Sequence, residues 1–162
     1  MPPVVYELVL APNEAQAELL TETMTRVNVA AEAFAAAVFP AQPESGAALR
    51  GQVGADVLKK FKLPVVLRDI ALESAAEALR RKSGKPKFGR SRALDLGFVV
   101  EWPLPDQARL PTVSGKRAIH TERDPSFGWV RSPLEKRPLS LERRGDRFVL
   151  VANDRPRDDD EE

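Results

Sequence analysis

The stretch that decides the fold reads VVYELVLAPNEAQ and spans Val4–Gln16. Its first seven residues are mainly β-branched, aromatic and aliphatic, which predicts a strand over residues 4–10. Pro12 ends that strand. Asn13 follows as a helix N-cap, with Gln16 three residues later in the position of a capping box. The chain is therefore expected to pass from strand to helix at Pro12.

Three helices are predicted after this switch. The first runs to about Phe39, because one face repeats apolar residues at steps of three and four, namely Leu20, Met24, Val27, Ala31, Phe34 and Val38. A weaker helix is predicted over residues 45–62, with Val53, Val57 and Phe61 on one side. The third begins at Pro64, a suitable first helical residue, and ends before Gly84. Its predicted inner face consists of Leu67, Ile70, Ala71, Ser74, Ala78 and Leu79.

Beyond residue 92 the apolar residues alternate instead. Leu94, Leu96, Phe98, Val100 and Trp102 share one side of the pattern, which predicts one strand with a buried face. Further short strands are predicted at about 116–121 and 127–131. A hairpin is predicted from Leu139 to Val151, turning through residues 143–146.

One strand is thus separated from the others by a helical block, which predicts an α+β fold with a helical insertion in a β-sheet or barrel. The expected organisation is a β-domain of residues 1–12 and 93–153, a helical lobe of residues 13–82, and a basic linker of residues 83–92. Residues 154–162, which end in five consecutive acids, are expected to be a disordered tail.

The composition excludes several kinds of chemistry. The 162 residues contain no Cys and one His, so thiol nucleophiles, disulfides, Cys-ligated zinc and multi-His metal sites are ruled out. His120 has no Ser or Cys partner at a recognisable spacing, and we predict neither catalytic residues nor a cofactor. The sequence lacks a run of about 20 apolar residues and the features of a secretory signal. It predicts a cytoplasmic protein with no membrane partner.

The net charge of +1 conceals a strong segregation along the chain. Residues 1–58 have two basic groups and seven acids, whereas residues 59–92 have eleven basic groups and three acids, a local charge of +8. Seven of the thirteen residues from Arg80 to Arg92 are basic and none is acidic. Clustered cations of this kind are typical of surfaces that bind nucleic-acid phosphates.

The candidate nucleic-acid-binding residues come from this basic region. Phe88 is included because an aromatic ring can stack on an unpaired base. Lys62 is a further possible contributor to the same face. The alternative interpretation is a solvated helix end and linker. The candidates are Lys59, Lys60, Arg80, Arg81, Lys82, Lys85, Lys87, Phe88, Arg90 and Arg92.

Several segments, in order along the chain, resemble the N-terminal half of the TnpB proteins of bacterial transposons. Tyr6–Leu20 is similar to the family's opening strand and capped helix, and Val27–Ala31 to the helix that follows. Lys59–Leu63, with Pro64, Ala71 and Ala75, resembles its later recognition helices. Lys85–Phe88 resembles its basic element before the barrel, and Phe127–Arg131 and Leu139–Val151 resemble its later strands.

The resemblance implies a small wedge-type β-barrel interrupted by a three-helix recognition lobe. TnpB proteins, and the related type V CRISPR effectors, are RNA-guided DNA endonucleases whose lobes hold a guide-RNA scaffold, the heteroduplex and target DNA. The family's RuvC-like nuclease half and Cys-rich zinc element have no counterpart here. We therefore expect a non-catalytic chain, whether a natural short form, a decayed remnant or one component of a split nuclease with a separate RuvC-like polypeptide.

The sequence leaves two other classes of protein open. One is a stand-alone, nuclease-dead regulator that binds DNA or RNA. The other is a protein-interaction module whose basic loop is merely solvated.

Overall fold

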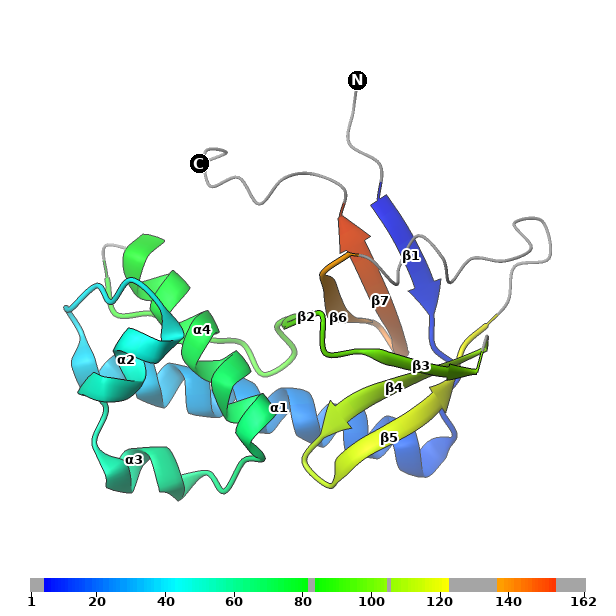
Figure 1. Ribbon diagram of the computed structural model, residues 1–162, viewed down its shortest axis with the longest axis horizontal. Coiled ribbons are helices and arrows are strands. Elements are labelled where there is room, and N and C mark those ends of the chain that lie inside the picture. The colour runs from blue at the N-terminus through cyan, green and yellow to red at the C-terminus, as the bar shows by residue number, and fades with distance from the viewer. Residues whose placement is uncertain (1–4, 82–83, 105, 123–136, 154–162) are drawn as a thin grey trace.

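The computed structural model describes residues 5–81, 84–104, 106–122 and 137–153, which form an α+β arrangement of helices beside antiparallel sheets (Figure 1). The elements in chain order are β1 (Val5–Val9), α1 (Glu14–Val38), α2 (Gly46–Gln52), α3 (Ala55–Lys60), α4 (Val65–Arg81), β2 (Leu94–Gly97), β3 (Glu101–Leu104), β4 (Gln107–Thr112), β5 (Gly115–His120), β6 (Leu139–Arg144) and β7 (Arg147–Asn153).

The strand-to-helix switch at Pro12 is confirmed. The Gln16 backbone N–H donates to Asn13 Oδ1 at 2.8 Å, and the Asn13 N–H donates to Gln16 Oε1 at 3.0 Å, which completes the capping box. The predicted apolar face of α1 is buried at Leu20, Met24 and Phe34 and at most of its other positions. Local sequence was sufficient here because capping and periodicity act within a few residues.

The predicted single helix over residues 45–62 is wrong. The chain forms two short helices, α2 and α3, because Val53 and Gly54 have extended backbones with ψ of 136° and 150°. Glycines at 51 and 54 weaken a continuous helix, and burial of Val53 stabilises the break. The described helical lobe therefore has four helices instead of three.

The prediction for α4 is confirmed in position, and its buried face is wider than expected. Ser74 is only half-buried, whereas Leu72, Ala75 and Ala76 are buried in addition to most of the predicted face. The reason is that α4 packs against both α1 and α2, so two sides of the helix are covered. None of the described helices is both long enough and apolar enough to cross a lipid bilayer.

The strands form two antiparallel sheets, in the orders β1-β7-β6-β2 and β3-β4-β5. They meet at one corner, where Leu10 bridges Thr121 and the Ala11 N–H donates to the His120 carbonyl at 2.7 Å. In the described part of the chain no ladder joins β2 to β3, so the expected barrel is not closed. The hairpin is confirmed as β6 and β7, which turn at Gly145 and Asp146.

The predicted strand over residues 94–102 is also wrong. It is two strands in different sheets, β2 and β3, separated by a turn at Gly97, whose φ of +56° lies in the left-handed region. The turn leaves Phe98 70% exposed instead of buried, while Leu96 and Val100 stay in the core. The alternation of apolar residues does not reveal that the glycine at this position takes a left-handed conformation and ends the strand.

Strand β4 was not predicted, although burial alternates over its first four residues, with Ala108 and Leu110 buried, before Pro111 and Thr112 are both buried. Pro111 argues against a central strand. It is tolerated because β3 pairs with β4 only from Gln107 to Arg109, so Pro111 lies beyond that ladder. The strand predicted at 116–121 is confirmed as β5. The predicted strand at 127–131 and the predicted tail at 154–162 lie outside the described residues.

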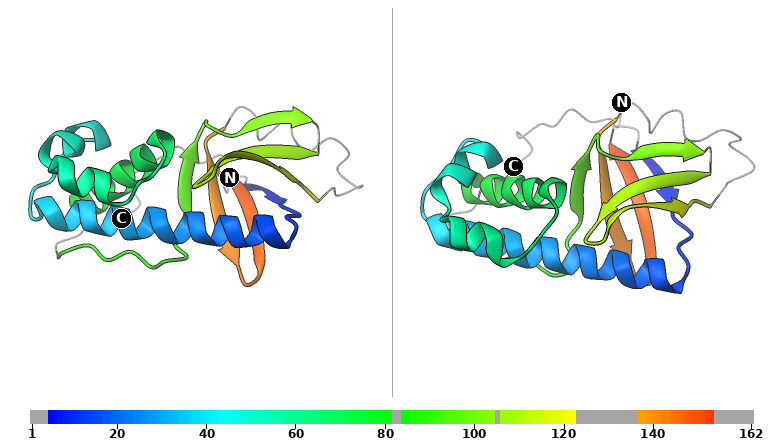
Figure 2. Two further views of the ribbon diagram at one scale, coloured as in Figure 1. Left: turned by 90° about the horizontal axis from the view of Figure 1, so that it is seen from below. Right: turned by 60° about the horizontal axis from the view of Figure 1, so that its bottom comes forward.

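Helix α1 connects the two halves of the molecule. Figure 2 shows its N-terminal part beneath the sheets and its C-terminal part beneath the other helices. Gln16 Nε2 donates to the Ala118 carbonyl at 3.2 Å, and the Val113 N–H donates to Thr23 Oγ1 at 3.1 Å. One buried apolar cluster extends through both halves. The predicted domain boundaries stay predictions.

Candidate nucleic-acid interface

The basic linker lies along α1, between the end of α4 and the start of β2 (Figure 2). Two side chains of α1 hold its backbone. Glu32 Oε1 accepts the Phe88 N–H at 2.7 Å, and Asn28 Nδ2 donates to the carbonyls of Arg90 at 3.2 Å and Arg92 at 2.9 Å. Asn28 is 2% exposed, so loss of its two partly buried hydrogen bonds would leave the buried amide unsatisfied. The described part of the linker is thus attached to α1 through its backbone.

Alternate residues of the linker point inward and outward. Pro86 and Phe88 are buried, whereas Lys85 and Lys87 are exposed, as expected of an extended segment against a packed surface. The Arg92 guanidinium carbon lies 4.4 Å from the centroid of the Phe88 ring, in cation–π contact. Phe88 is only 6% exposed, which argues against its predicted stacking on a base. Its ring anchors the linker to the core instead.

Three linker cations have no ionic partner among the residues that the structure describes. Lys85, Lys87 and Arg90 are exposed, and no carboxylate of the described residues lies within 4.0 Å of their charged groups. The side chain of Glu32, the acid that the linker does contact, accepts a backbone N–H instead of pairing with a lysine. The charges of these three residues are therefore available to a ligand in solvent.

Two candidates at the end of α4 have contacts within the protein. Arg80 Nη1 donates to the carbonyls of Pro43 at 3.0 Å and Glu44 at 2.9 Å, which fastens the loop between α1 and α2. Arg81 pairs with Glu77 one helical turn earlier, at 3.4 Å. Lys82 lies outside the described residues.

Lys59 and Lys60 do not lie on the same side as the linker. They are exposed in the last turn of α3, and Figure 2 shows α3 and the linker on opposite sides of α1. Arg26 Nη2 donates to the Phe61 carbonyl at 3.0 Å, whereas Asn28 binds the linker. Residues two apart on a helix point about 200° apart around its axis. The contact of Arg26 with the end of α3 and the contact of Asn28 with the linker therefore lie on opposite sides of α1. Lys62, which follows α3, is exposed there too, and the expected common face is wrong.

The sheets carry cations that sequence reasoning did not single out, and several are paired across strands. Glu101 of β3 is bound by Arg109 of β4 at 3.2 Å and Lys116 of β5 at 2.9 Å, and hydrogen bonds from Lys116 and Arg109 lower the pKa of its carboxyl. Arg144 binds both oxygens of Glu7, at 2.9 and 2.8 Å. This hydrogen bonding lowers the pKa of Glu7 and raises that of Arg144.

Across the ranges that the structure describes, no three His, Asp or Glu side chains gather closely enough to hold a metal ion. No protein-family model and no curated protein matches this chain. The resemblance to TnpB proteins therefore stays a prediction from the sequence motifs.

Proposed function

We propose that this chain binds nucleic acid through the linker cations, a name that we give to Lys85, Lys87 and Arg90. Arg92 lies beside them and contributes to the same surface. The observation that carries the proposal is a contrast within the described part of the chain: the charges are exposed and have no carboxylate partner there, whereas the linker backbone is anchored to α1. Neutralising phosphates releases counterions, which favours binding to any polyanionic strand.

The anchored backbone matters for affinity. A flexible basic loop loses conformational entropy when it settles on a ligand, at roughly 1–2 kcal/mol per ordered residue. The contacts of Phe88 with the core, and of Asn28 and Glu32 with the linker backbone, impose much of that order before any ligand arrives. Binding through these cations therefore costs less conformational entropy than binding through a flexible loop of the same composition.

The TnpB resemblance makes structured RNA the first ligand to test. On this proposal the chain is the wedge-type, non-catalytic part of an RNA-guided DNA-targeting system, and a separate RuvC-like polypeptide supplies cleavage. A chain that prefers duplex DNA without any RNA would fit the stand-alone regulator class instead.

The direct test is fluorescence anisotropy with labelled structured RNA, single-stranded RNA and duplex DNA at several salt concentrations. We expect affinity to fall steeply with salt. For single-stranded RNA, the triple variant Lys85→Ala, Lys87→Ala, Arg90→Ala should reduce the slope of log K against log salt by about 2, because each phosphate contact contributes about 0.7. Absence of binding at low salt, or an unchanged slope in the triple variant, would refute the proposal. Circular dichroism checks that the variant stays folded.

A further inference from the structure

The tip of the β6–β7 hairpin adjoins the end of the linker. In the left view of Figure 2, both segments emerge on the same side of α1. Within the ladder between β2 and β6, Leu94 is opposite Leu141. Arg92 precedes Leu94 by two residues and Arg143 follows Leu141 by two. The antiparallel register, carried two residues past the ladder, therefore gives the two arginines facing positions on one side of the sheet.

Both arginines lie close to an aromatic ring of the core. The guanidinium carbon of Arg143 is 5.8 Å from the centroid of the Phe148 ring, and Arg92 lies over Phe88 at 4.4 Å. The two rings are fixed in position, because both are buried. Arg143 Nε donates to the Gly145 carbonyl at 3.1 Å, and its Nη groups have no partner among the described residues. The outer donors of Arg143 are thus free to bind a ligand.

The two facing positions have the same charge and no nearby acid. Both arginines are exposed, and no carboxylate in the described ranges lies within 4.0 Å of either guanidinium. The nearest acids in sequence are Glu142, which pairs with Arg144 on the other side of the sheet, and Asp146 in the turn. Like charges opposite each other on neighbouring strands repel. An anion bound between them would relieve that repulsion.

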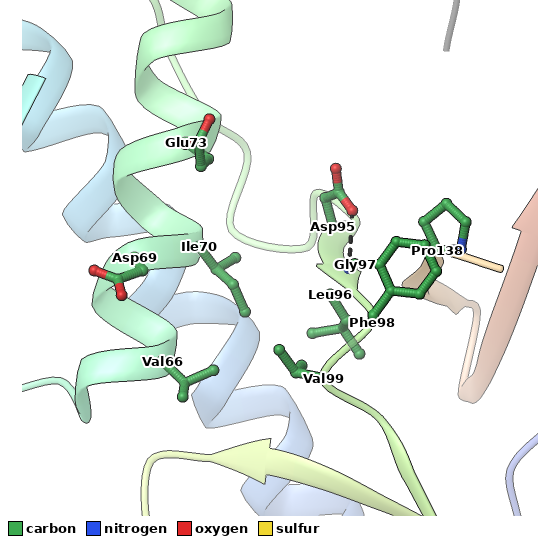
Figure 3. A pocket seen from close by; sticks show the side chains of 10 residues that line it. All are labelled: Val66, Asp69, Ile70, Glu73, Asp95, Leu96, Gly97, Phe98, Val99 and Pro138. Carbon is green, nitrogen blue, oxygen red and sulfur yellow. Dashed lines mark hydrogen bonds between the residues drawn. The ribbon is translucent and has the colours of Figure 1, made fainter. Parts of the chain in front are cut away.

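The groove between α4 and the turn after β2 offers no comparable anion site. It has a volume of about 550 Å³, and Val66, Ile70 and Phe98 are among its apolar walls (Figure 3). No Lys, Arg or His lines this groove. A phosphate group there would have no cationic ligand, so the charges favour the hairpin instead.

We propose that Arg92 and Arg143 together bind one phosphate group of the nucleic acid, where the ligand passes from the linker cations to the β6–β7 hairpin. The inference rests on the proposed function, since it extends the same surface by one subsite. A guanidinium suits this subsite because its planar, forked N–H donors match two oxygens of a phosphate. The contact is to the backbone of the nucleic acid, so it is independent of base sequence.

Two adjacent arginines provide the test and its matched control. With labelled oligouridine in anisotropy titrations, Arg143→Ala should weaken binding about fivefold at about 0.1 M salt, because one phosphate contact is lost. Arg144→Ala removes the same charge from the next residue, which Glu7 and Glu142 already bind. It should weaken binding less than about twofold. Equal effects of the two variants, or none from Arg143→Ala, would overturn the inference.

A double-mutant cycle tests whether the two arginines share one phosphate. The variant Arg92→Ala, Arg143→Ala should weaken binding by less than the product of the two single effects, because the second substitution acts on a phosphate that has already lost part of its site. Arg92→Ala with Lys85→Ala, at the far end of the linker, is the control pair, and its single effects should multiply. Effects that multiply for Arg92 and Arg143 as well would overturn the shared subsite.

The linker triple variant separates this inference from the proposed function. Weaker binding by the triple variant with unchanged binding by Arg143→Ala would refute the subsite and leave the linker interface standing. Unchanged binding by both would refute both. Arg143 is exposed, so circular dichroism of Arg143→Ala should match that of the wild type.

Discussion

The cations of the linker and the cations of the sheets differ in what surrounds them. Arg109, Lys116 and Arg144 each have a glutamate within 3.2 Å, whereas Lys85 and Lys87 have no described carboxylate within 4.0 Å. Both sets are basic residues whose side chains reach solvent, although Arg109 is half-buried, and the sequence alone does not distinguish them.

The difference follows from how each segment is held. In an antiparallel sheet, cross-strand register brings side chains of neighbouring strands together, as with Glu101 opposite Arg109. None of the described strands pairs with the linker. It is held by Glu32 and Asn28, which bind its backbone and leave the lysine side chains unpaired. A local count of basic residues therefore does not reveal which charges are available.

The largest expected effect tests the anchor of the linker. Phe88→Ala should destabilise the protein by about 3–5 kcal/mol, because it empties a buried aromatic site in the core. Urea unfolding followed by circular dichroism measures this loss. Phe98→Ala is the matched control and should change stability by less than about 0.5 kcal/mol, since its ring is 70% exposed. Equal losses of stability in the two variants would contradict the assignment of Phe88 as buried and Phe98 as exposed.

The second prediction compares the two sets of cations directly. The linker triple variant should weaken RNA binding by about 10- to 100-fold at moderate salt, since three phosphate contacts are lost. The sheet triple variant, Arg109→Ala, Lys116→Ala, Arg144→Ala, should weaken it less than about threefold, because those charges are already paired. Anisotropy titrations under identical salt measure both. A larger effect from the sheet variant would place the binding surface on the sheets.

The third prediction concerns the hydrogen bonds that hold the linker. Asn28→Asp keeps the shape of the side chain but removes the amide donor to the carbonyls of Arg90 and Arg92. It should cost about 1–3 kcal/mol at neutral pH by leaving buried groups unsatisfied. Hydrogen exchange of the linker amides should accelerate as well. Unchanged exchange with unchanged stability would mean that Asn28 does not hold the linker.

The smallest effect is a pH dependence on the sheet side. The hydrogen bond from Arg144 lowers the pKa of Glu7 in the folded protein below its ordinary value of 4.5. A lowered pKa contributes stability above the ordinary value, and this contribution disappears as pH falls through the folded value. Because the pair is exposed, the contribution is below about 0.5 kcal/mol.

Thermal melts of wild type and Glu7→Gln check this dependence. Their stabilities should differ near neutral pH and converge between about pH 5 and about pH 3 at low salt. Curves that stay parallel over this range would contradict a role for the pair.

Features specified by neighbouring residues were predictable. The capping box of Asn13 and Gln16, the extent of α1 and the hairpin at Gly145 all depend on interactions within a few positions. Features that depend on packing were not. The break between α2 and α3 depends on burial of Val53, and strand β4 tolerates Pro111 only because β3 stops short of it.

The sequence by itself determined where strands give way to helices and where positive charge accumulates, because periodicity, capping and composition are local properties. Only the tertiary structure decided which side chains are available. Phe88 was expected to be open to a base and is buried, whereas Phe98 was expected in the core and is exposed. The physical reason is that exposure depends on what packs from elsewhere in the chain: α1 covers the linker, and the turn at Gly97 takes Phe98 out of its strand.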